Sequence, residues 1–102
     1  MEKKLYVTVT NERFTLGNAD KSMVVTCENK SDIYTNSEKA LEECAKYTRG
    51  MVYIFCNDMR LVERMSGKVR IRDKQVLRHI LNLKLLEGIF RDVKYFHVMT
   101  RG

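Results

Sequence analysis

The sequence predicts a mixed α/β fold in which helices pack on a five-stranded sheet whose first three strands are antiparallel. Two observations lead to this prediction. The chain opens with short runs of β-forming residues separated by turn residues, which favours an antiparallel meander. Further along, helical periodicity alternates with apolar, strand-like runs, which indicates helices between the later strands. The predicted order is β-β-β-α-β-α-α-β.

The meander is expected to use the first third of the chain. Residues 5–10 are all β-formers, and residues 11–15 either extend or bend that first strand before the turn Gly17-Asn18-Ala19-Asp20. Residues 23–27 predict the second strand, and residues 32–35 predict a short third strand after another turn.

Helices and strands then alternate. The string Thr35-Asn36-Ser37 offers N-cap side chains to a helix reaching Gly50, and the apolar run 51–56 is typical of a central strand. A short helix is expected over 59–65, followed by residues 68–72 as an extended stretch or loop. A long helix with a broad apolar face follows the N-cap residue Asp73, and residues 93–98 predict the last strand.

The bulk composition is that of one globular domain spanning residues 1–102. Hydrophobic residues make up 44% and charged residues 31% of the chain, and no apolar run approaches the roughly 20 residues that span a bilayer. The amino terminus lacks the features of a signal peptide, so we expect a cytoplasmic protein without a membrane segment. Cys27, Cys44 and Cys56 are odd in number and widely spaced, which favours reduced core residues.

No cofactor is expected. Neither a GxxxxGK[ST] nor a GxGxxG string is present, and no CxxC pair suggests zinc. His79 and His97 have no nearby combination of nucleophile and acid, so both are interpreted as structural. The scattered methionines are explained by core packing.

Two strings resemble parts of the ribonuclease H family. Thr35-Asn36-Ser37-Glu38-Lys39-Ala40-Leu41 is similar to the start of that family's first helix, and the run from Val52 to Val62 is similar to its fourth strand and the short helix that follows. Residues 86–101 resemble its last long helix and fifth strand. The resemblance covers most of the chain and implies a ribonuclease-H-like fold.

The resemblance also implies a missing active site. Enzymes of that family hold two divalent ions with four carboxylates around the scissile phosphate. Aligned by these strings, the first-strand aspartate falls at Thr8, the helix glutamate at Ala40 and the fourth-strand aspartate at Asn57. The fourth carboxylate belongs to a further helix after the fifth strand, beyond Gly102. We therefore expect a chain that is not an enzyme.

A shifted alignment would bring Glu38 or Asp58 towards the site. A one-residue shift on a strand turns a side chain to the opposite face, so Asp58 would serve only beyond the strand end. The simpler interpretation of Asp58 is a helix N-cap. A surviving metal-dependent nuclease rests on these two carboxylates alone.

The strongest functional signal is basic. The formal net charge is +6, and seven cations lie within nineteen residues with only Glu63 and Asp73 opposing them. On an extended stretch, arginines two residues apart point to one side and can neutralise successive phosphates. We call these cations the basic segment: Arg60, Arg64, Lys68, Arg70, Arg72, Lys74 and Arg78.

Two hypotheses follow. The first is a non-catalytic, ribonuclease-H-like module that binds DNA or RNA through the basic segment with weak sequence selectivity. The second is a protein interaction module, such as an inhibitor or assembly factor encoded by a phage or mobile element. It would meet an acidic protein surface or pair through a strand edge, including as a homodimer. Several aromatic residues are spread over the strands and receive no role: Tyr6, Phe14, Tyr34, Tyr53 and Tyr95.

Overall fold

A computed structural model describes residues 4–99, and its elements follow the predicted order β-β-β-α-β-α-α-β. Within that range, no helix is both long enough and apolar enough to cross a membrane. The strands are β1 (Lys4–Val9), β2 (Arg13–Gly17), β3 (Val24–Glu28), β4 (Met51–Cys56) and β5 (Asp92–His97), and the helices are α1 (Ile33–Cys44), α2 (Met59–Met65) and α3 (Lys74–Glu87).

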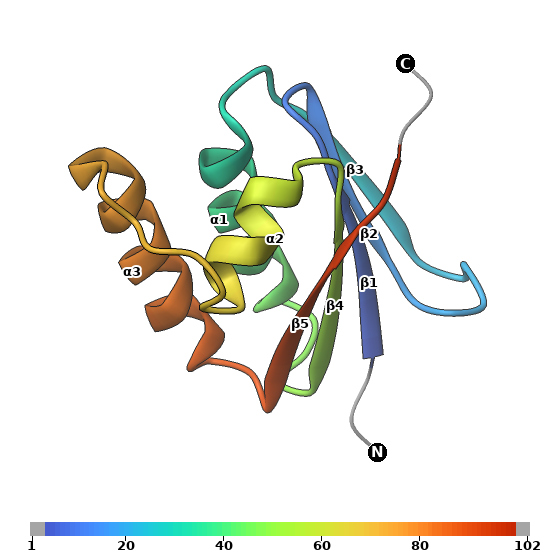
Figure 1. Cartoon of the computed structure of the whole chain (residues 1–102). Helices are drawn as coiled ribbons and strands as arrows, with labels where there is room; N and C mark the ends of the chain where they lie inside the picture. The colour runs from blue at the N-terminus through green and yellow to red at the C-terminus, as the bar shows by residue number, and fades with distance from the viewer. Residues whose placement is uncertain (1–3, 100–102) are drawn as a thin grey trace.

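The five strands form one mixed sheet with the spatial order β3-β2-β1-β4-β5. The pairs β1–β2 and β2–β3 are antiparallel, whereas β1–β4 and β4–β5 are parallel. The three helices lie on one face of the sheet (Figure 1), and among the described residues no helix covers the other face. The predicted fold class, a five-stranded mixed sheet with antiparallel first strands and helices packed on it, is confirmed.

The meander is shifted along the chain relative to the prediction. Residues 11–15 are expected to extend or bend the first strand, but residues 13–17 form the separate strand β2. The strand predicted at 23–27 is β3. A tight turn separates β1 from β2. The Thr10 backbone N–H donates to the Arg13 carbonyl oxygen at 2.9 Å, and the Thr10 hydroxyl accepts from the Arg13 N–H at 3.2 Å.

The third strand predicted at 32–35 is wrong, because these residues open α1. Asp32 is its N-cap and accepts from the Thr35 backbone N–H at 2.9 Å and from the Thr35 hydroxyl at 2.7 Å. Ile33 and Tyr34 are buried on the inner side of the helix. The cap and this burial together outweigh the β preference of the string. The helix ends at Cys44 rather than near Gly50.

The later elements follow the prediction closely. β4 and α2 have the expected bounds, and β5 begins one residue earlier than expected. Asp73 caps α3, accepting from the backbone N–H groups of Gln75 at 2.8 Å and Val76 at 3.2 Å. Residues 68–72 form a loop rather than a strand.

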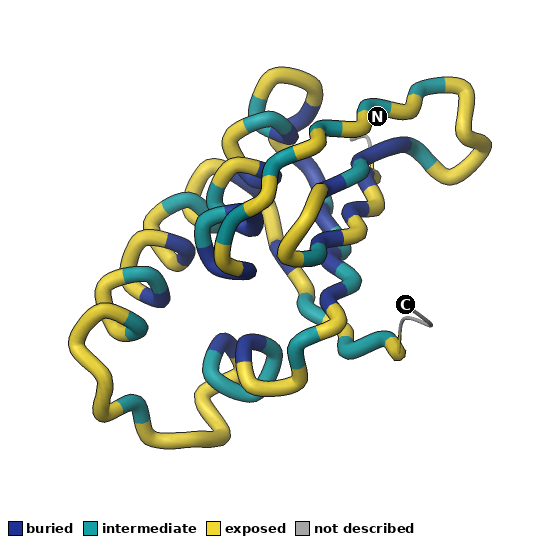
Figure 2. Tube along the Cα trace, turned by 90° about the horizontal axis from the view of Figure 1, so that it is seen from above, coloured by how far each residue is buried: buried dark blue, intermediate teal, exposed yellow. Residues whose placement is uncertain are grey.

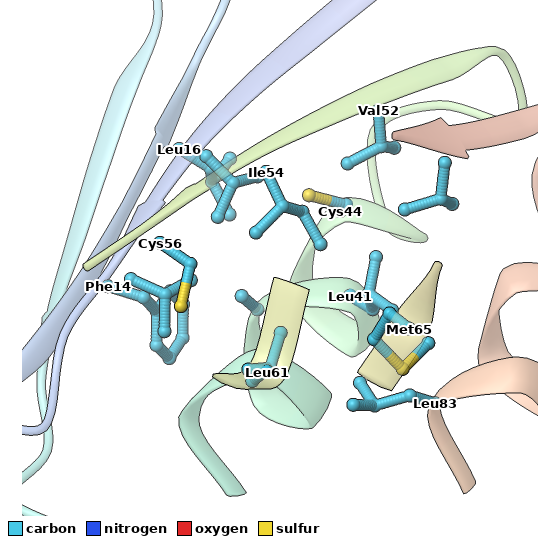
Figure 3. Packing of buried hydrophobic residues seen from close by; sticks show 14 of the residues in the cluster. Phe14, Leu16, Leu41, Cys44, Val52, Ile54, Cys56, Leu61, Met65 and Leu83 are labelled. Carbon is cyan, nitrogen blue, oxygen red and sulfur yellow. The ribbon is translucent and has the colours of Figure 1, made fainter. Parts of the chain in front are cut away.

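The core lies between the sheet and the helices (Figures 2 and 3). Alternate residues of β1 and β4 point into it, and Leu41, Leu61 and Leu83 meet them from the three helices. Burial raises the pKa of the Cys44 thiol to about 12 and of the Cys56 thiol to about 11, so both stay protonated at neutral pH. All three cysteines are free thiols, with Cys27 half-buried.

The broad apolar face predicted for α3 is only partly used. Ile80 and Leu83 are buried, whereas Leu77, Leu81 and Leu85 are exposed. The exposed leucines are four residues apart and therefore share one side of the helix. The structure thus leaves this side of the apolar helix exposed.

One buried amide joins the hairpin to the helical layer. Asn36, fully buried in α1, donates through its side-chain nitrogen to the carbonyl oxygens of Thr10 and Asn29, both at 2.8 Å. Its side-chain oxygen accepts from the Asn29 amide at 2.8 Å. These bonds hold the β1–β2 turn and the β3–α1 connection against α1.

Replacing Asn36 with alanine should lower the free energy of unfolding by about 2 kcal/mol, because buried partners lose their hydrogen bonds. Urea unfolding followed by circular dichroism measures this. Asn11→Ala, at an exposed position in the β1–β2 turn, serves as the control and should change the free energy of unfolding by less than about 0.5 kcal/mol. An equal small effect in both variants would show that Asn36 is not a structural link.

Candidate functional site

Two positions that the sequence resemblance aligns with catalytic carboxylates, Thr8 and Ala40, do not lie at the same site. Thr8 is exposed on the sheet face opposite the helices, whereas Ala40 is fully buried on the inner side of α1. Val9, the next residue, points to the helix side and pairs with Cys56. Thr8 and Ala40 therefore lie on opposite sides of the sheet, and the neighbouring β1 residue on the same side as Ala40 is Val9. None of these residues is a carboxylate.

Asn57 and Asp58 border a hollow at the end of the sheet. Its volume is about 520 Å³, and it lies where the carboxyl ends of β4 and β5 meet the β1–β2 turn and the start of α2. Sequence analysis did not anticipate that His97 would face this place, although carboxyl ends of parallel strands commonly form sites. The lining residues are Asn11, Asn57, Asp58, Met59, Arg60 and His97.

Asp58 caps α2, as interpreted from the sequence. Its Oδ1 accepts from the backbone N–H groups of Arg60 at 2.9 Å and Leu61 at 3.2 Å. The carboxylate thus stabilises the first turn of α2, where unpaired backbone N–H groups favour a negative charge.

Glu38 is held elsewhere, in a contact between α1 and α3. Its Oε1 lies 3.0 Å from His79 Nδ1, and the His79 ring stacks on Tyr34 with centroids 5.5 Å apart. Arg64 donates to the Tyr34 hydroxyl at 2.6 Å, which ties α2 to the same group. His79 therefore links helices, which agrees with a structural role. In residues 4–99, no group of three or more His, Cys, Asp and Glu side chains could hold a metal ion.

The basic segment runs from the start of α2 to the first half of α3. The amino ends of both helices lie at the same end of the molecule as the carboxyl ends of β4 and β5, and the intervening loop runs back between them (Figure 1). Arg60 lines the hollow, whereas Arg64 is partly buried and committed to Tyr34. The remaining members are exposed: Lys68, Arg70, Arg72, Lys74 and Arg78.

The cations of this segment have no acidic partner. Within the described part of the chain, none of the seven forms an ion pair, although other cations do. Asp73, one of the two opposing acids, is engaged in capping α3. With seven cations against Glu63 and Asp73, the surface from α2 to α3 carries an excess of positive charge that attracts anions.

The aromatic residues without a predicted role divide into two groups. Phe14 and Tyr34 are buried in the core, and half-buried Tyr95 donates to Glu87 at 3.0 Å. Tyr6 and Tyr53 instead lie on the uncovered face of the sheet, together with Phe55 and Phe96. The period-two pattern of β1 and β4 could have revealed this face once the helices were assigned to the other.

Solved structures share this fold, although no protein-family model and no curated protein sequence matches the chain. The N-terminal ribonuclease H domain of a Mycobacterium tuberculosis protein, solved as a fusion with maltose-binding protein, superposes with a TM-score of 0.80 at 16% identity, covering 95% of this chain and 83% of that one. Ribonuclease H1 from the archaeon Halobacterium salinarum superposes with a TM-score of 0.78 at 17% identity, covering 95% of this chain and 85% of that one.

A third structure is a ribonuclease H1 isolated from compost, in complex with an RNA/DNA hybrid. It superposes with a TM-score of 0.72 at 12% identity, covering 94% of this chain and 84% of that one. At such low identities these similarities establish the ribonuclease H fold of the chain. They confirm the resemblance found in the sequence at the level of the fold.

The capping role of Asp58 predicts a distinctive pair of results. Asp58→Ala should lower the free energy of unfolding by about 1 kcal/mol, whereas Asp58→Asn should stay within a few tenths of a kcal/mol, because asparagine caps helices as well as aspartate. Urea unfolding of both variants measures the difference. Equal losses would mean that the charge, rather than the cap, is what the fold uses.

Proposed function

We propose that the chain is a non-catalytic nucleic-acid-binding module that contacts the phosphate backbone of DNA or RNA through the basic segment. The observation that carries this proposal is the set of exposed cations between α2 and α3 that no acid neutralises. Arginine and lysine side chains bind phosphates largely independently of sequence, so the expected selectivity is weak.

The loop gives these cations a suitable arrangement. Ile71 is half-buried and packs against the core, whereas Arg70 and Arg72 on either side of it are exposed. In an extended backbone, side chains two residues apart are about 6.5 Å from one another on one side. The anchored Ile71 therefore presents both guanidinium groups outward, where each is able to reach a phosphate.

The absence of catalysis is supported by the side chains at the positions that matter. Thr8, Ala40 and Asn57 offer no carboxylate, and neither does Val9 on the helix side of β1. Asp58 caps a helix, and Glu38 contacts His79. A two-ion mechanism needs several carboxylates around one point. One protein of this fold was solved in complex with an RNA/DNA hybrid, so the fold is able to present a surface that binds nucleic acid. Such binding does not itself require the carboxylates that cleavage needs. The three free thiols suit the reducing cytoplasm.

A second candidate function, binding to an acidic protein, is favoured by one specific observation. The exposed leucines Leu77, Leu81 and Leu85 lie on α3, the helix that also carries Lys74 and Arg78. An apolar stripe beside cations is the arrangement expected of a surface that binds a protein rather than phosphate. The edge strands β3 and β5 offer a further route to a partner or a second copy.

If phosphate is the ligand, binding should weaken steeply with salt. Fluorescence anisotropy with labelled single strand, duplex and RNA/DNA hybrid between about 50 and 200 mM salt measures this slope. Arg70→Ala combined with Arg72→Ala should lower the slope of log affinity against log salt by roughly 2, since each lost phosphate contact removes about 0.9 on a duplex.

The matched control removes two exposed lysines from other elements, Lys30→Ala with Lys39→Ala. It makes the same change in net charge and should leave the slope nearly unchanged. Equal effects of both double variants would show that only the overall charge matters. No effect of the arginine variant would contradict the proposal. Failure to bind any of the labelled nucleic acids would favour the protein-binding alternative.

The chain should not cleave labelled RNA/DNA hybrid in the presence of Mg²⁺ or Mn²⁺, because the carboxylates of a two-ion site are missing. Gel analysis after long incubation is the measurement. Metal-dependent cleavage that disappears in Asp58→Asn would contradict the non-catalytic assignment. Cleavage that a chelator leaves unchanged would identify a contaminating nuclease.

A further inference from the structure

The uncovered face of the sheet has an unusual composition. Strand pairing places side chains on it in two rows that cross the strands from β3 to β5. Because every second residue of a strand points to this face, the rows follow directly from the register. The first row is Val24, Gly17, Tyr6, Tyr53 and Lys94, and the second is Thr26, Thr15, Thr8, Phe55 and Phe96.

Four aromatic rings on β1, β4 and β5 form a stacked block. Tyr6 and Tyr53 have centroids 5.3 Å apart with planes 18° from parallel, and Phe55 and Phe96 have centroids 5.3 Å apart at 21°. Tyr6 and Phe96 are 36% and 41% exposed. Exposed rings of this number rarely gather on the surface of a protein without a ligand.

The block stops at β2, where Gly17 stands next to Tyr6. A Cβ atom on Gly17 would lie 2.6 Å from the Met23 carbonyl oxygen, so this position excludes any larger residue. A groove of about 310 Å³ borders this position on the uncovered face. Its lining residues are Tyr6, Thr8, Thr15, Leu16, Gly17, Asn18, Lys21 and Val24.

The groove has the dimensions of a stacking position. Neighbouring strands are about 4.8 Å apart, so Tyr6 on β1 and Val24 on β3, on either side of Gly17, are separated by about twice that distance. One face of the Tyr6 ring packs on Tyr53, and its other face borders the groove. A flat ring placed in the groove against the outer face of Tyr6 would continue the stack towards β2, with Val24 on its far side.

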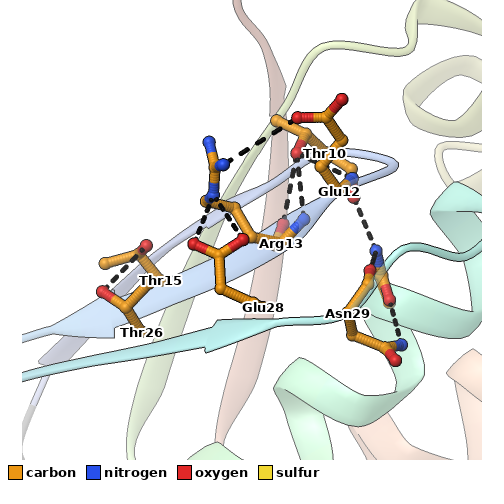
Figure 4. A network of polar contacts seen from close by, with 8 residues as sticks. Thr10, Glu12, Arg13, Thr15, Thr26, Glu28 and Asn29 are labelled. Carbon is orange, nitrogen blue, oxygen red and sulfur yellow. Dashed lines mark hydrogen bonds and ion pairs between the residues drawn. The ribbon is translucent and has the colours of Figure 1, made fainter.

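The rim of the groove is polar and carries a positive charge. Thr15 and Thr26 cross the floor of the β2–β3 hairpin, with their hydroxyl oxygens 3.4 Å apart (Figure 4). Lys21 is held in place by a left-handed backbone with φ of 59° and by a bond from its N–H to the Asn18 carbonyl oxygen at 3.1 Å. In residues 4–99 Lys21 forms no ion pair.

We propose that this groove binds an unpaired nucleobase of a single-stranded nucleic acid, which stacks on Tyr6 while Lys21 contacts a phosphate of the same strand. Stacking on aromatic side chains within a positively charged groove is how proteins hold single strands. The proposal rests on the proposed function for the class of ligand, but it uses the face opposite the helices. A duplex keeps its bases stacked inside and is not expected to enter.

A second copy of the chain is a poorer occupant. Packing two such faces together would bury Lys94 and the exposed ion pair between Arg13 and Glu28, whose Nε and Oε1 lie 2.8 Å apart (Figure 4). Burying charged groups that stay imperfectly paired opposes association.

The chain contains no tryptophan, so Tyr6→Trp creates a single fluorescent reporter in the groove. Titration with an oligothymidylate of about 15 nucleotides should quench its emission to saturation. Tyr47→Trp is the matched control, because Tyr47 is also 36% exposed but lies after α1. Equal quenching by a duplex, or equal quenching of both reporters, would overturn the proposal. Saturation by thymidine monophosphate at the same concentration would overturn the assignment to a strand.

Variants without a reporter separate this proposal from the proposed function. Tyr6→Ala and Thr15→Phe, which fills the groove while keeping Tyr6, should each weaken single-strand binding about tenfold without changing duplex binding. Tyr6→Phe keeps the ring and should bind normally. If Tyr6→Ala fails to fold, Thr15→Phe carries the test.

The outcomes are distinct. Unchanged single-strand affinity in Thr15→Phe overturns the groove, while the salt effect of the Arg70 and Arg72 variant would still support the basic segment. Failure to bind any nucleic acid overturns both proposals. A salt-resistant dimer in sedimentation that Tyr6→Ala dissociates would assign this face to a second copy and overturn the groove.

Discussion

The parallel pairing of β1 with β4 at the centre of the sheet decides what each face of the molecule does. Its register sets Leu5 opposite Val52 on the helix side and Tyr6 opposite Tyr53 on the other side. Because side chains alternate, a one-residue slip would bury the tyrosines and expose the aliphatic residues. The apolar core, the covered positions of α1 to α3 and the aromatic block outside all depend on this single register. The basic segment and the groove therefore lie on opposite sides of the sheet.

Several acidic residues have a structural task within the fold. Asp32, Asp58 and Asp73 cap the three helices in turn, so each carboxylate satisfies backbone N–H groups. Glu38 contacts His79. Glu87 accepts a hydrogen bond from the Tyr95 hydroxyl, and burial raises the pKa of its carboxyl group. The cations between α2 and α3 have no comparable internal task apart from Arg64. A chain with a formal net charge of +6 thus leaves its excess where anions reach it.

Most of the fold was predictable from the sequence, because the long elements have clear periodicity and good caps. The strand order could not be predicted from local patterns. The antiparallel meander was predicted, but the bounds of its second and third strands were wrong where local and tertiary preferences disagree. The β1–β2 turn at Asn11 and Glu12 lacks the glycine that usually marks a tight hairpin. Residues 32–35 have a local preference for a strand, but Asp32 acts as the N-cap of a helix that begins at Ile33. The basic segment was found from charge alone. The groove was not, since it depends on Gly17 lying beside Tyr6, which is a matter of register between strands.

Amide chemical-shift mapping of the isotope-labelled chain with a single-stranded oligonucleotide tests the central claim, that this ribonuclease H fold binds nucleic acid without cleaving it. The account predicts two separate patches of shifted signals, one along residues 68–78 and one around Gly17 and Lys21, with the oligonucleotide recovered intact in the presence of Mg²⁺. Shifts confined to the hollow beside Asn57 and Asp58, accompanied by cleavage, would contradict it, as would a spectrum that no nucleic acid changes.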